Sequence, residues 1–341
     1  MDIWVDIINP SHALFFNSLL DDFNSDNFLT TVRDRAETSG LVKSLGMKGI
    51  VIGRDYREGF NKSLNMIWRT FLLCYKVRAF DYALSFENGM SVAVSKFRGK
   101  KSILLCDNDL KFFQKGNYLQ DLENKIKAMA ECIIVPNGCY TNFKKYIKDK
   151  EKIISYNGFK EDIYIANFDP DPDFKDKIPF RSFVVLRPES LGSFYVDEKQ
   201  SLVPNLLKLF NRENINVIYL PREKEDFDYS KEFDVYIPKK PLNGLDLCYY
   251  ADAVLTGSGT MAREAACLGK PSISFFPGKN LLSVDKKLVE EKKMFHSRDA
   301  QKIVDFVLSR KGNIESTLDF SRSKNVKKEV VKIINYIIHE N

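Results

Sequence analysis

The 341-residue chain is poor in the residues that build metal centres and disulfide frameworks. It has six cysteines and three histidines, and no two cysteines form a Cys-x-x-Cys pair. This pattern argues against a zinc site or disulfides and predicts buried free thiols. No apolar run approaches the roughly 20 residues that span a bilayer. With 44% hydrophobic and 29% charged residues, the composition is that of an ordinary soluble globular protein.

The chain also lacks a basic N-terminal segment. Asp2 and Asp6 stand where a secretory signal would have cations, and the apolar residues between them alternate as in a strand. We therefore expect a cytoplasmic protein. The net charge of +6 is modest. It fits a lysine-rich surface, anionic substrates or an anionic membrane, and with no recognition-helix or base-stacking motif we expect no nucleic acid partner.

What is present is an alternation of short apolar segments with helical ones, which predicts α/β layers with parallel sheets. We expect strands at residues 3–7, 29–32, 49–53, 82–86, 102–106, 132–135 and 153–156, then at 182–186, 216–220, 235–237, 253–255 and 272–275. A chain of this length predicts two domains, because a single hydrophobic core rarely grows past about 250–300 residues. Two prolines among acids at residues 169–173 predict a linker. We expect Rossmann-like domains at 1–168 and 174–322, then a helical segment at 323–341.

The most informative segment is residues 256–271. A turn of small residues, Gly257, Ser258 and Gly259, separates an apolar strand from a helix that ends near residue 269. Small residues let a ligand approach the backbone, and a helix N-terminus attracts anions. The turn, through Thr260, therefore predicts a diphosphate site, although such turns also occur without a ligand. One turn into the helix, Arg263 adds a cation and Glu264 an acceptor for ribose hydroxyls.

This segment resembles the nucleotide-sugar loop of the UDP-N-acetylglucosamine 2-epimerases. Ser258, Gly259, Glu264 and residues 268–271 match at the same spacing, while Thr260 stands where a second glycine is usual. The loop is also similar to that of the lipid-linked N-acetylglucosaminyltransferase of peptidoglycan synthesis. With residues 1–16, 220–222, 241–247 and 275–279, the chain resembles domain-of-unknown-function family 354 over about residues 1–310.

These resemblances imply a GT-B fold, in which two Rossmann-like domains face a central cleft and the C-terminal domain holds the nucleotide. They further imply a final helix that crosses back to the first domain. The implied substrate is a nucleotide-diphosphate sugar. We expect no metal or cofactor to be required, since a helix N-terminus and arginines can stabilise a leaving diphosphate.

Ligands of open α/β sheets bind at the carboxyl ends of the strands. In the first domain these loops contain a histidine that can act as an acid/base or bind a phosphate, and a group of carboxylates that can act as a base. The alternative is that the histidine caps a helix and that the carboxylates are helix N-caps. The catalytic candidates are His12, Glu87, Asp107 and Asp109, with Asn9, Pro10 and Asn88 as substrate contacts.

In the second domain the corresponding loops offer arginines for the diphosphate. An arginine at a strand end is otherwise a surface ion pair. The candidates are Arg187, Glu189 and Arg222 for the phosphates, Leu242 beside the base, and Pro277 and Gly278 beside the sugar. The epimerases have a histidine near Arg187 that this chain lacks, which puts an epimerase mechanism in doubt.

The segment from Phe60 to Phe80 contains four cations, no acid and many large apolar residues. A basic amphipathic helix of this kind can lie on an anionic membrane, which would suit a lipid-linked acceptor. The alternative is a helix packed on the core with a wet basic face.

Three functions remain open from the sequence. The first is a GT-B glycosyltransferase that uses a nucleotide-diphosphate sugar, with a UDP-linked donor and an acceptor from cell-envelope glycan synthesis. The second is a sugar-nucleotide 2-epimerase, which needs an acid/base pair at the sugar and no acceptor. The third is a non-catalytic module that binds a nucleotide sugar, in keeping with a homodimer.

Overall fold

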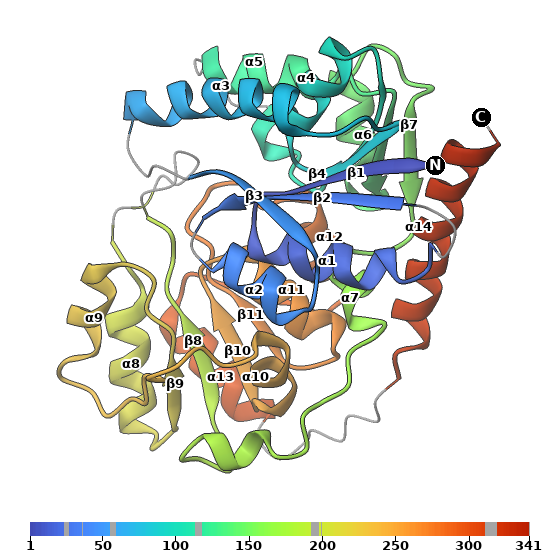
Figure 1. The fold of residues 1–341 in the computed structure, drawn as a ribbon. Helices are drawn as coiled ribbons and strands as arrows, with labels where there is room; N and C mark the ends of the chain where they lie inside the picture. Colours follow the sequence, from blue (N-terminus) through green and yellow to red (C-terminus); the bar gives the residue numbers. More distant parts are fainter. Residues whose placement is uncertain are drawn as a thin grey trace. The chain divides into compact units, whose positions relative to one another are not determined.

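The computed structural model describes residues 1–23, 27–35, 37–54, 59–112, 118–191, 198, 200–310 and 319–340, without the side chains of 59–63. The chain divides into two compact units (Figure 1). Unit 1 comprises Met1–Ala166 and Ser323–Asn341, and unit 2 comprises Asn167–Arg322. Residues 169–173 therefore lie inside unit 2. There the backbone N–H of Asp171 donates to the Asp246 carboxylate at 2.9 Å, and the Tyr250 hydroxyl donates to the Asp171 carbonyl at 2.8 Å.

Unit 1 is built on a seven-stranded parallel sheet in the order β3-β2-β1-β4-β5-β6-β7. The strands are β1 (Asp2–Ile7), β2 (Asn27–Asp34), β3 (Gly49–Arg54), β4 (Tyr82–Phe86), β5 (Lys101–Leu105), β6 (Cys132–Pro136) and β7 (Ile153–Tyr156). β4 and β6 are buried throughout and β1 beyond its first residue, which explains their nearly continuous apolar sequences. The strand order reverses between β1 and β4.

Helices cover both faces of this sheet (Figure 1). The helices α3, α4 and α5 lie along one face, and α1 and α2 lie on the other. The helices of the unit are α1 (Pro10–Leu20), α2 (Thr38–Ser44), α3 (Gly59–Lys76), α4 (Gly89–Phe97), α5 (Tyr118–Lys127), α6 (Asn137–Tyr146), α7 (Lys160–Ile165) and α14 (Ser321–His339), with a 3-10 turn at Leu110–Phe112. None of the helices in the described ranges is long and apolar enough to cross a membrane.

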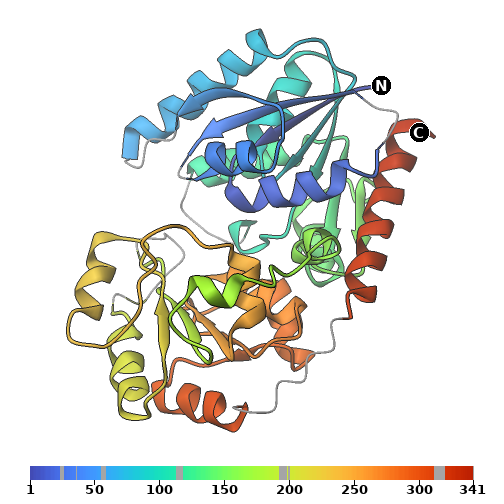
Figure 2. The same ribbon diagram turned by 60° about the horizontal axis from the view of Figure 1, so that its bottom comes forward.

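The C-terminal helix α14 belongs to unit 1 and packs on it (Figure 2). The Ser323 hydroxyl donates to Asp162 at 2.8 Å, and the Tyr82 hydroxyl donates to the Ile337 carbonyl at 3.2 Å. A Cβ added to Gly158 would lie 2.4 Å from Val326, so only glycine permits this close contact.

A buried ion pair lies in the core of unit 1. Asp6 and Arg69 are 0% and 2% exposed, and the guanidinium donates to both carboxylate oxygens at 2.7 and 2.8 Å. The Thr31 hydroxyl donates to the same carboxylate at 2.6 Å, and Arg69 Nε donates to the Ile52 carbonyl at 2.8 Å. The pair is compensated by these further hydrogen bonds, which a buried charge pair requires.

Unit 2 is built on a five-stranded parallel sheet in the order β12-β11-β10-β8-β9. Its strands are β8 (Val184–Arg187), β9 (Val217–Tyr219), β10 (Ala253–Thr256), β11 (Ser272–Ser274) and β12 (Phe295–His296). The expected strand at 235–237 is reduced to one bridge between Ile218 and Tyr236. Its helices are α8 (Val203–Arg212), α9 (Lys224–Ser230), α10 (Gly244–Tyr250), α11 (Gly259–Cys267), α12 (Ser283–Glu290) and α13 (Ala300–Arg310). The strand order reverses between β8 and β10.

Candidate functional site

Each unit has one point at which its strand order reverses, and ligands of open parallel sheets bind outside the carboxyl ends of the strands at this point. In unit 1 the point lies between β1 and β4, whose following residues include His12 and Glu87. In unit 2 it lies between β8 and β10, followed by Glu189 and by the Gly257–Gly259 turn. The sequence candidates therefore gather at the expected edge of each sheet.

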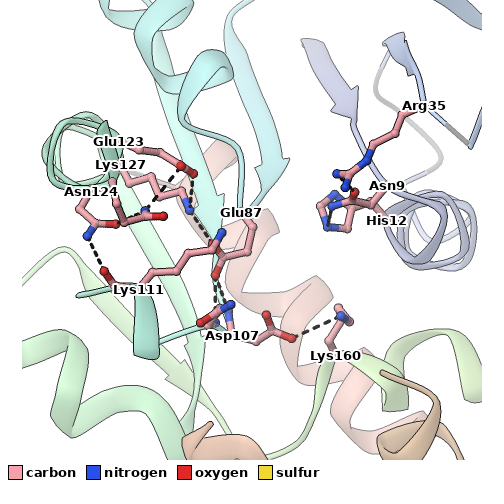
Figure 3. A network of polar contacts seen from close by, with 12 residues as sticks. Asn9, His12, Arg35, Glu87, Asp107, Lys111, Glu123, Asn124, Lys127 and Lys160 are labelled. Carbon is pink, nitrogen blue, oxygen red and sulfur yellow. Dashed lines mark hydrogen bonds and ion pairs between the residues drawn. The ribbon is translucent and has the colours of Figure 1, made fainter. Parts of the chain in front are cut away.

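Glu87 is a carboxylate of unit 1 with several close partners (Figure 3). It accepts hydrogen bonds from the backbone N–H groups of Asp107 at 3.1 Å and Asn108 at 2.9 Å, and its Oε2 lies 2.6 Å from Lys127 Nζ and 3.7 Å from Lys111 Nζ. Burial alone would raise the pKa of Glu87, but the two ammonium groups outweigh it and lower the pKa to about 2. Glu87 also has a positive φ of 49°, which a non-glycine residue adopts only when its surroundings hold it there.

These contacts give Glu87 a different role from the expected general base. A carboxylate with a pKa near 2 accepts a proton poorly at neutral pH. Its bonds instead fix the loop that follows β5. The sequence did not indicate Lys127, because Glu123 stands four residues before it and suggests a solvent-exposed helix pair. In the structure Lys127 is 2% exposed, and Glu123 Oε1 lies 3.0 Å from its Nζ.

Asp107 has fewer partners. Its Oδ2 lies 3.3 Å from Nζ of Lys160 (Figure 3). That ammonium lies 5.3 Å from the centre of the Phe86 ring. Tyr156 is buried, and its hydroxyl has no hydrogen-bond partner among the described residues. Burial, followed by the Asp107 carboxylate, raises the pKa of Tyr156 well above its usual value, so the phenol stays neutral. Asp109 accepts a hydrogen bond from Asn142 Nδ2 at 2.6 Å.

His12 lies in the first turn of α1, which begins at Pro10. Arg35 Nη1 donates to Asn9 Oδ1 at 2.6 Å, so the Asn9 amide nitrogen points at His12 Nε2, 3.4 Å away (Figure 3). This geometry assigns the proton of a neutral His12 to Nδ1, which has no partner in the described part of the chain. Burial, followed by the Lys160 ammonium, lowers the pKa of His12 well below its usual value. His12 is thus a neutral hydrogen-bond donor.

The side chain of Asn88 forms its hydrogen bonds within unit 1. Its Nδ2 donates to Asp6 at 2.7 Å, its Oδ1 accepts from the Met90 backbone N–H at 3.1 Å, and it is 1% exposed. The expectation that Asn88 contacts a substrate does not fit this position. It caps α4 and compensates the buried Asp6 carboxylate instead.

In unit 2 the turn after β10 is held in place from both sides. Thr256 is the register partner of Arg187 on β8, and the N–H of Gly257 donates to the Arg187 carbonyl at 3.1 Å. The Thr256 hydroxyl oxygen accepts from the N–H of Ser258 at 2.9 Å. Helix α11 begins at Gly259, and the Ser258 side chain does not cap it. The N-terminus of α11 is therefore held at the switch point without a cap from the Ser258 side chain.

Contacts within the protein leave no room for a side chain at the two glycines of the turn. A Cβ on Gly257 would lie 2.3 Å from Glu189 Cγ and 2.6 Å from its Cα. Glu189 is 3% exposed and accepts from the Leu202 N–H at 2.9 Å and the Ser201 hydroxyl at 2.8 Å. Glu189 therefore joins the loop after β8 to α8, and its expected contact with a phosphate does not fit this bonding.

Arg263 also has a protein partner. Its Nη1 donates to Asp285 at 2.9 Å, and both side chains are 5% exposed. A Cβ on Gly259 would lie 2.3 Å from the same Nη1. The sequence placed the charge of Arg263 against a diphosphate, whereas the structure places it against α12.

The other candidates of unit 2 lie in loops or in the helix that follows the switch point. Arg187 is half-buried at the end of β8, and Arg222 is exposed after β9. The half-buried Leu242 precedes α10, Pro277 (buried) and Gly278 (half-buried) follow β11, and Glu264 is buried in α11. Within the described ranges, no three His, Cys, Asp or Glu side chains come together as a metal site would require.

Comparison with known proteins gives the fold an independent basis. The chain is similar to the UDP-N-acetylglucosamine 2-epimerase of Methanocaldococcus jannaschii in complex with UDP-N-acetylglucosamine and UDP, with a TM-score of 0.72, 13% identity and coverage of 98% of this chain and 100% of that one. It is similar to the Neisseria meningitidis epimerase bound to UDP-N-acetylglucosamine, with a TM-score of 0.65, 12% identity and full coverage of both chains. The glycosyltransferase of kitacinnamycin gives a TM-score of 0.59 at 11% identity, with 98% of both chains covered.

These similarities confirm the GT-B fold predicted from the sequence. An uncharacterized protein of Methanocaldococcus jannaschii is 25% identical over 362 residues, with 99% of each chain covered. A family model described as "Protein of unknown function (DUF354)" matches residues 1–336, so the chain belongs to that family.

Proposed function

We propose that the protein binds a nucleotide-diphosphate sugar in unit 2 and transfers the sugar to an acceptor hydroxyl. The observation that carries this proposal is the N-terminus of α11 at the β8/β10 switch point, which its N-cap residue Ser258 does not cap with its side chain. Diphosphate oxygens accept from its backbone N–H groups at Gly259 and Thr260 and from the Ser258 hydroxyl. The M. jannaschii epimerase of the same fold, in complex with UDP-N-acetylglucosamine and UDP, supports this ligand class.

The other contacts of the donor follow from the loops around this helix. Arg187 and Arg222 offset the charge that develops on the leaving diphosphate. Glu264 accepts from ribose hydroxyls, and Leu242 lies against a uracil base. Pro277 and Gly278 line the sugar position after β11.

On the acceptor side we assign the base to Asp107. Glu87 is held as a carboxylate with a pKa of about 2, and Asp109 is bonded to Asn142, whereas the carboxylate of Asp107 has the Lys160 ammonium as its partner. Asp107 takes the proton of the acceptor hydroxyl as that oxygen bonds to the anomeric carbon. The bond from this carbon to the diphosphate breaks, and its electron pair leaves with the diphosphate. His12 Nδ1–H and the Tyr156 hydroxyl donate hydrogen bonds to substrate oxygens. A lipid-linked glycan of the cell envelope would provide such a hydroxyl.

A sugar-nucleotide 2-epimerase is the second candidate, because solved structures of the same fold are epimerases. Such an enzyme needs an acid and a base on opposite faces of the sugar. Asp107 and Lys160, whose charged groups lie 3.3 Å apart, would supply both groups from one side only. A module that binds the nucleotide sugar without turnover is the third.

The first experiment is a thermal-shift titration with UDP, UDP-N-acetylglucosamine, GDP and TDP. A UDP species should raise Tm in the wild type and in Glu290→Ala, an exposed control on α12 of the same unit, but not in Glu264→Ala. No stabilisation by any nucleotide would refute the donor site.

NMR of the donor then separates the three functions. Consumption of the donor only when an acceptor is added supports transfer, and inversion at C2 without acceptor supports the epimerase. An Asp107→Asn variant should keep the Tm shift and lose turnover. Stabilisation with no turnover under any acceptor leaves the binding module.

A further inference from the structure

Helix α3 presents an apolar stripe on its outer surface. Leu64, Ile67, Trp68, Phe71 and Tyr75 recur at helical spacing and are 50%, 57%, 63%, 65% and 90% exposed. The stripe extends over the twelve residues from Leu64 to Tyr75, or about 16 Å of helix. Single exposed apolar residues are ordinary, but a continuous stripe with three aromatic side chains marks a contact surface.

The stripe is rigidly supported from below. Leu73, on the opposite face of α3, and Val77, directly after the helix, are buried in one cluster with Trp4 and Phe80. Arg69 ties the helix to the core through its bonds to Asp6. The exposed side chains are therefore presented by a fixed helix.

The neighbouring helices continue this surface. α3 contacts α4, and α4 contacts α5, so that the three lie side by side (Figure 1). At the end of α4, Phe97 is 80% exposed, and Tyr118, Leu119 and Leu122 are exposed on α5.

The charges on α3 and α4 have one sign. Neither helix contains an Asp or Glu, while Lys76, Arg78 and Lys96 are exposed at their C-terminal ends. The first acid after α3, Asp81, accepts from the Asp2 backbone N–H at 3.1 Å. On α5, Glu123 pairs with Lys127.

We propose that this surface, the α3 stripe with its flanking cations, docks unit 1 onto an anionic lipid bilayer. Trp68, Phe71 and Tyr75 enter the headgroup region, where Trp and Tyr concentrate in membrane proteins. Lys76, Arg78 and Lys96 meet anionic headgroups. The inference does not depend on the proposed chemistry, because it uses none of the residues assigned to it.

A second copy of the chain is the competing occupant, and the charges disfavour it. A twofold contact through α3 sets the same surface against itself, and neither α3 nor α4 of the other copy offers an acid to offset Lys76, Arg78 and Lys96. An anionic bilayer complements the same cations.

The test is sedimentation with vesicles of phosphatidylcholine, with and without phosphatidylglycerol. The wild type should bind only the anionic vesicles, and less tightly as salt is raised. Trp68→Ser/Phe71→Ser and, separately, Lys76→Glu/Arg78→Glu should each raise the lipid concentration for half-binding on the order of tenfold or more. Phe227→Ser and Lys302→Glu, exposed positions on α9 and α13 of unit 2, should bind as the wild type does.

Tryptophan fluorescence tests the proposal on the wild type alone, so the result does not depend on whether a variant folds. Of the two tryptophans, Trp4 is fully buried, so a blue shift of tryptophan fluorescence on adding anionic vesicles reports on Trp68. Absence of that shift and of sedimentation would overturn the proposal. A stable dimer by light scattering that Trp68→Ser/Phe71→Ser converts to monomer would assign the stripe to a second copy instead.

Discussion

Replacing Glu87 by glutamine tests whether this carboxylate braces the site or reacts in it. Lowering its pKa from 4.5 to about 2 means that folding favours the ionised form by about 3 kcal/mol. Glu87→Gln keeps the shape, removes the charge and leaves the Lys127 ammonium with Glu123 as its remaining close carboxylate. We expect a loss of about 3 kcal/mol in the free energy of unfolding of unit 1 at pH 7.

Urea-induced unfolding followed by tryptophan fluorescence measures this loss selectively, because both tryptophans, Trp4 and Trp68, lie in unit 1. The matched control is Glu131→Gln, an exposed position that precedes β6 in the same unit. It should change the free energy of unfolding by less than about 0.5 kcal/mol.

The contribution of Glu87 to the free energy of unfolding should also depend on pH. Since folding lowers the pKa of Glu87, its stabilisation is fully present above pH 4.5 and is lost as the pH falls from 4.5 toward 2. The difference between the wild type and Glu87→Gln should therefore be constant from pH 7 to pH 5 and then shrink. A difference that already shrinks near pH 6, or one no larger than that of Glu131→Gln, would refute the structural role and return Glu87 to the candidate bases.

Three further predictions follow from the same contacts. Burial and Lys160 lower the pKa of His12, so the contribution of neutral His12 to the free energy of unfolding is present above pH 6.5 and is lost below it. The free energy of unfolding measured with urea should therefore fall less between pH 7 and pH 5.5 in His12→Gln than in the wild type. Gly257→Ala forces a Cβ to within 2.6 Å of the Glu189 backbone and should weaken the Tm shift produced by a UDP species, whereas an unchanged shift would show that the two loops separate freely. Asp6→Asn should destabilise unit 1 by about 3–5 kcal/mol, because it leaves the buried Arg69 charge uncompensated, and near-neutral unfolding data would contradict this.

The sequence was sufficient for the elements whose signal is local. The apolar segments near Trp4, Leu84 and Val254 are buried strands, and the small-residue turn before α11 is where the pattern placed it. The strand at 235–237 was wrong because a single bridge to Ile218 is all that its backbone forms. The two-residue strand β12 was too short to give a periodic signal. Sheet order was not predictable, since it depends on which strands pair across long connections.

The sequence predicted which loops hold the candidate residues, but not the contacts that these residues make. The strand-end rule selected the loops of His12 and Glu87, because ligands of open α/β sheets bind outside the carboxyl ends of the strands. It could not foresee the Arg35–Asn9 contact that places the His12 proton on Nδ1, since Arg35 is 26 residues away in the chain. It could not foresee that Asp285, on a later helix, neutralises Arg263.

Glu87 and Asp107 differ because the partners of a buried carboxylate determine how strongly its ionised form is stabilised. Glu87 and Asp107 have similar exposure, 9% and 7%, and follow neighbouring strands. Two ammonium groups and two backbone N–H groups hold Glu87, whereas the Asp107 carboxylate lies 3.3 Å from one ammonium, that of Lys160. The first arrangement lowers the pKa of Glu87 to about 2, so Glu87 accepts a substrate proton poorly at neutral pH. Oδ2 of Asp107 has no hydrogen-bond partner in the described part of the chain besides its ion pair with Lys160. This difference in partners, between two carboxylates at the same edge of the sheet, is the reason that we propose Asp107 and not Glu87 as the base.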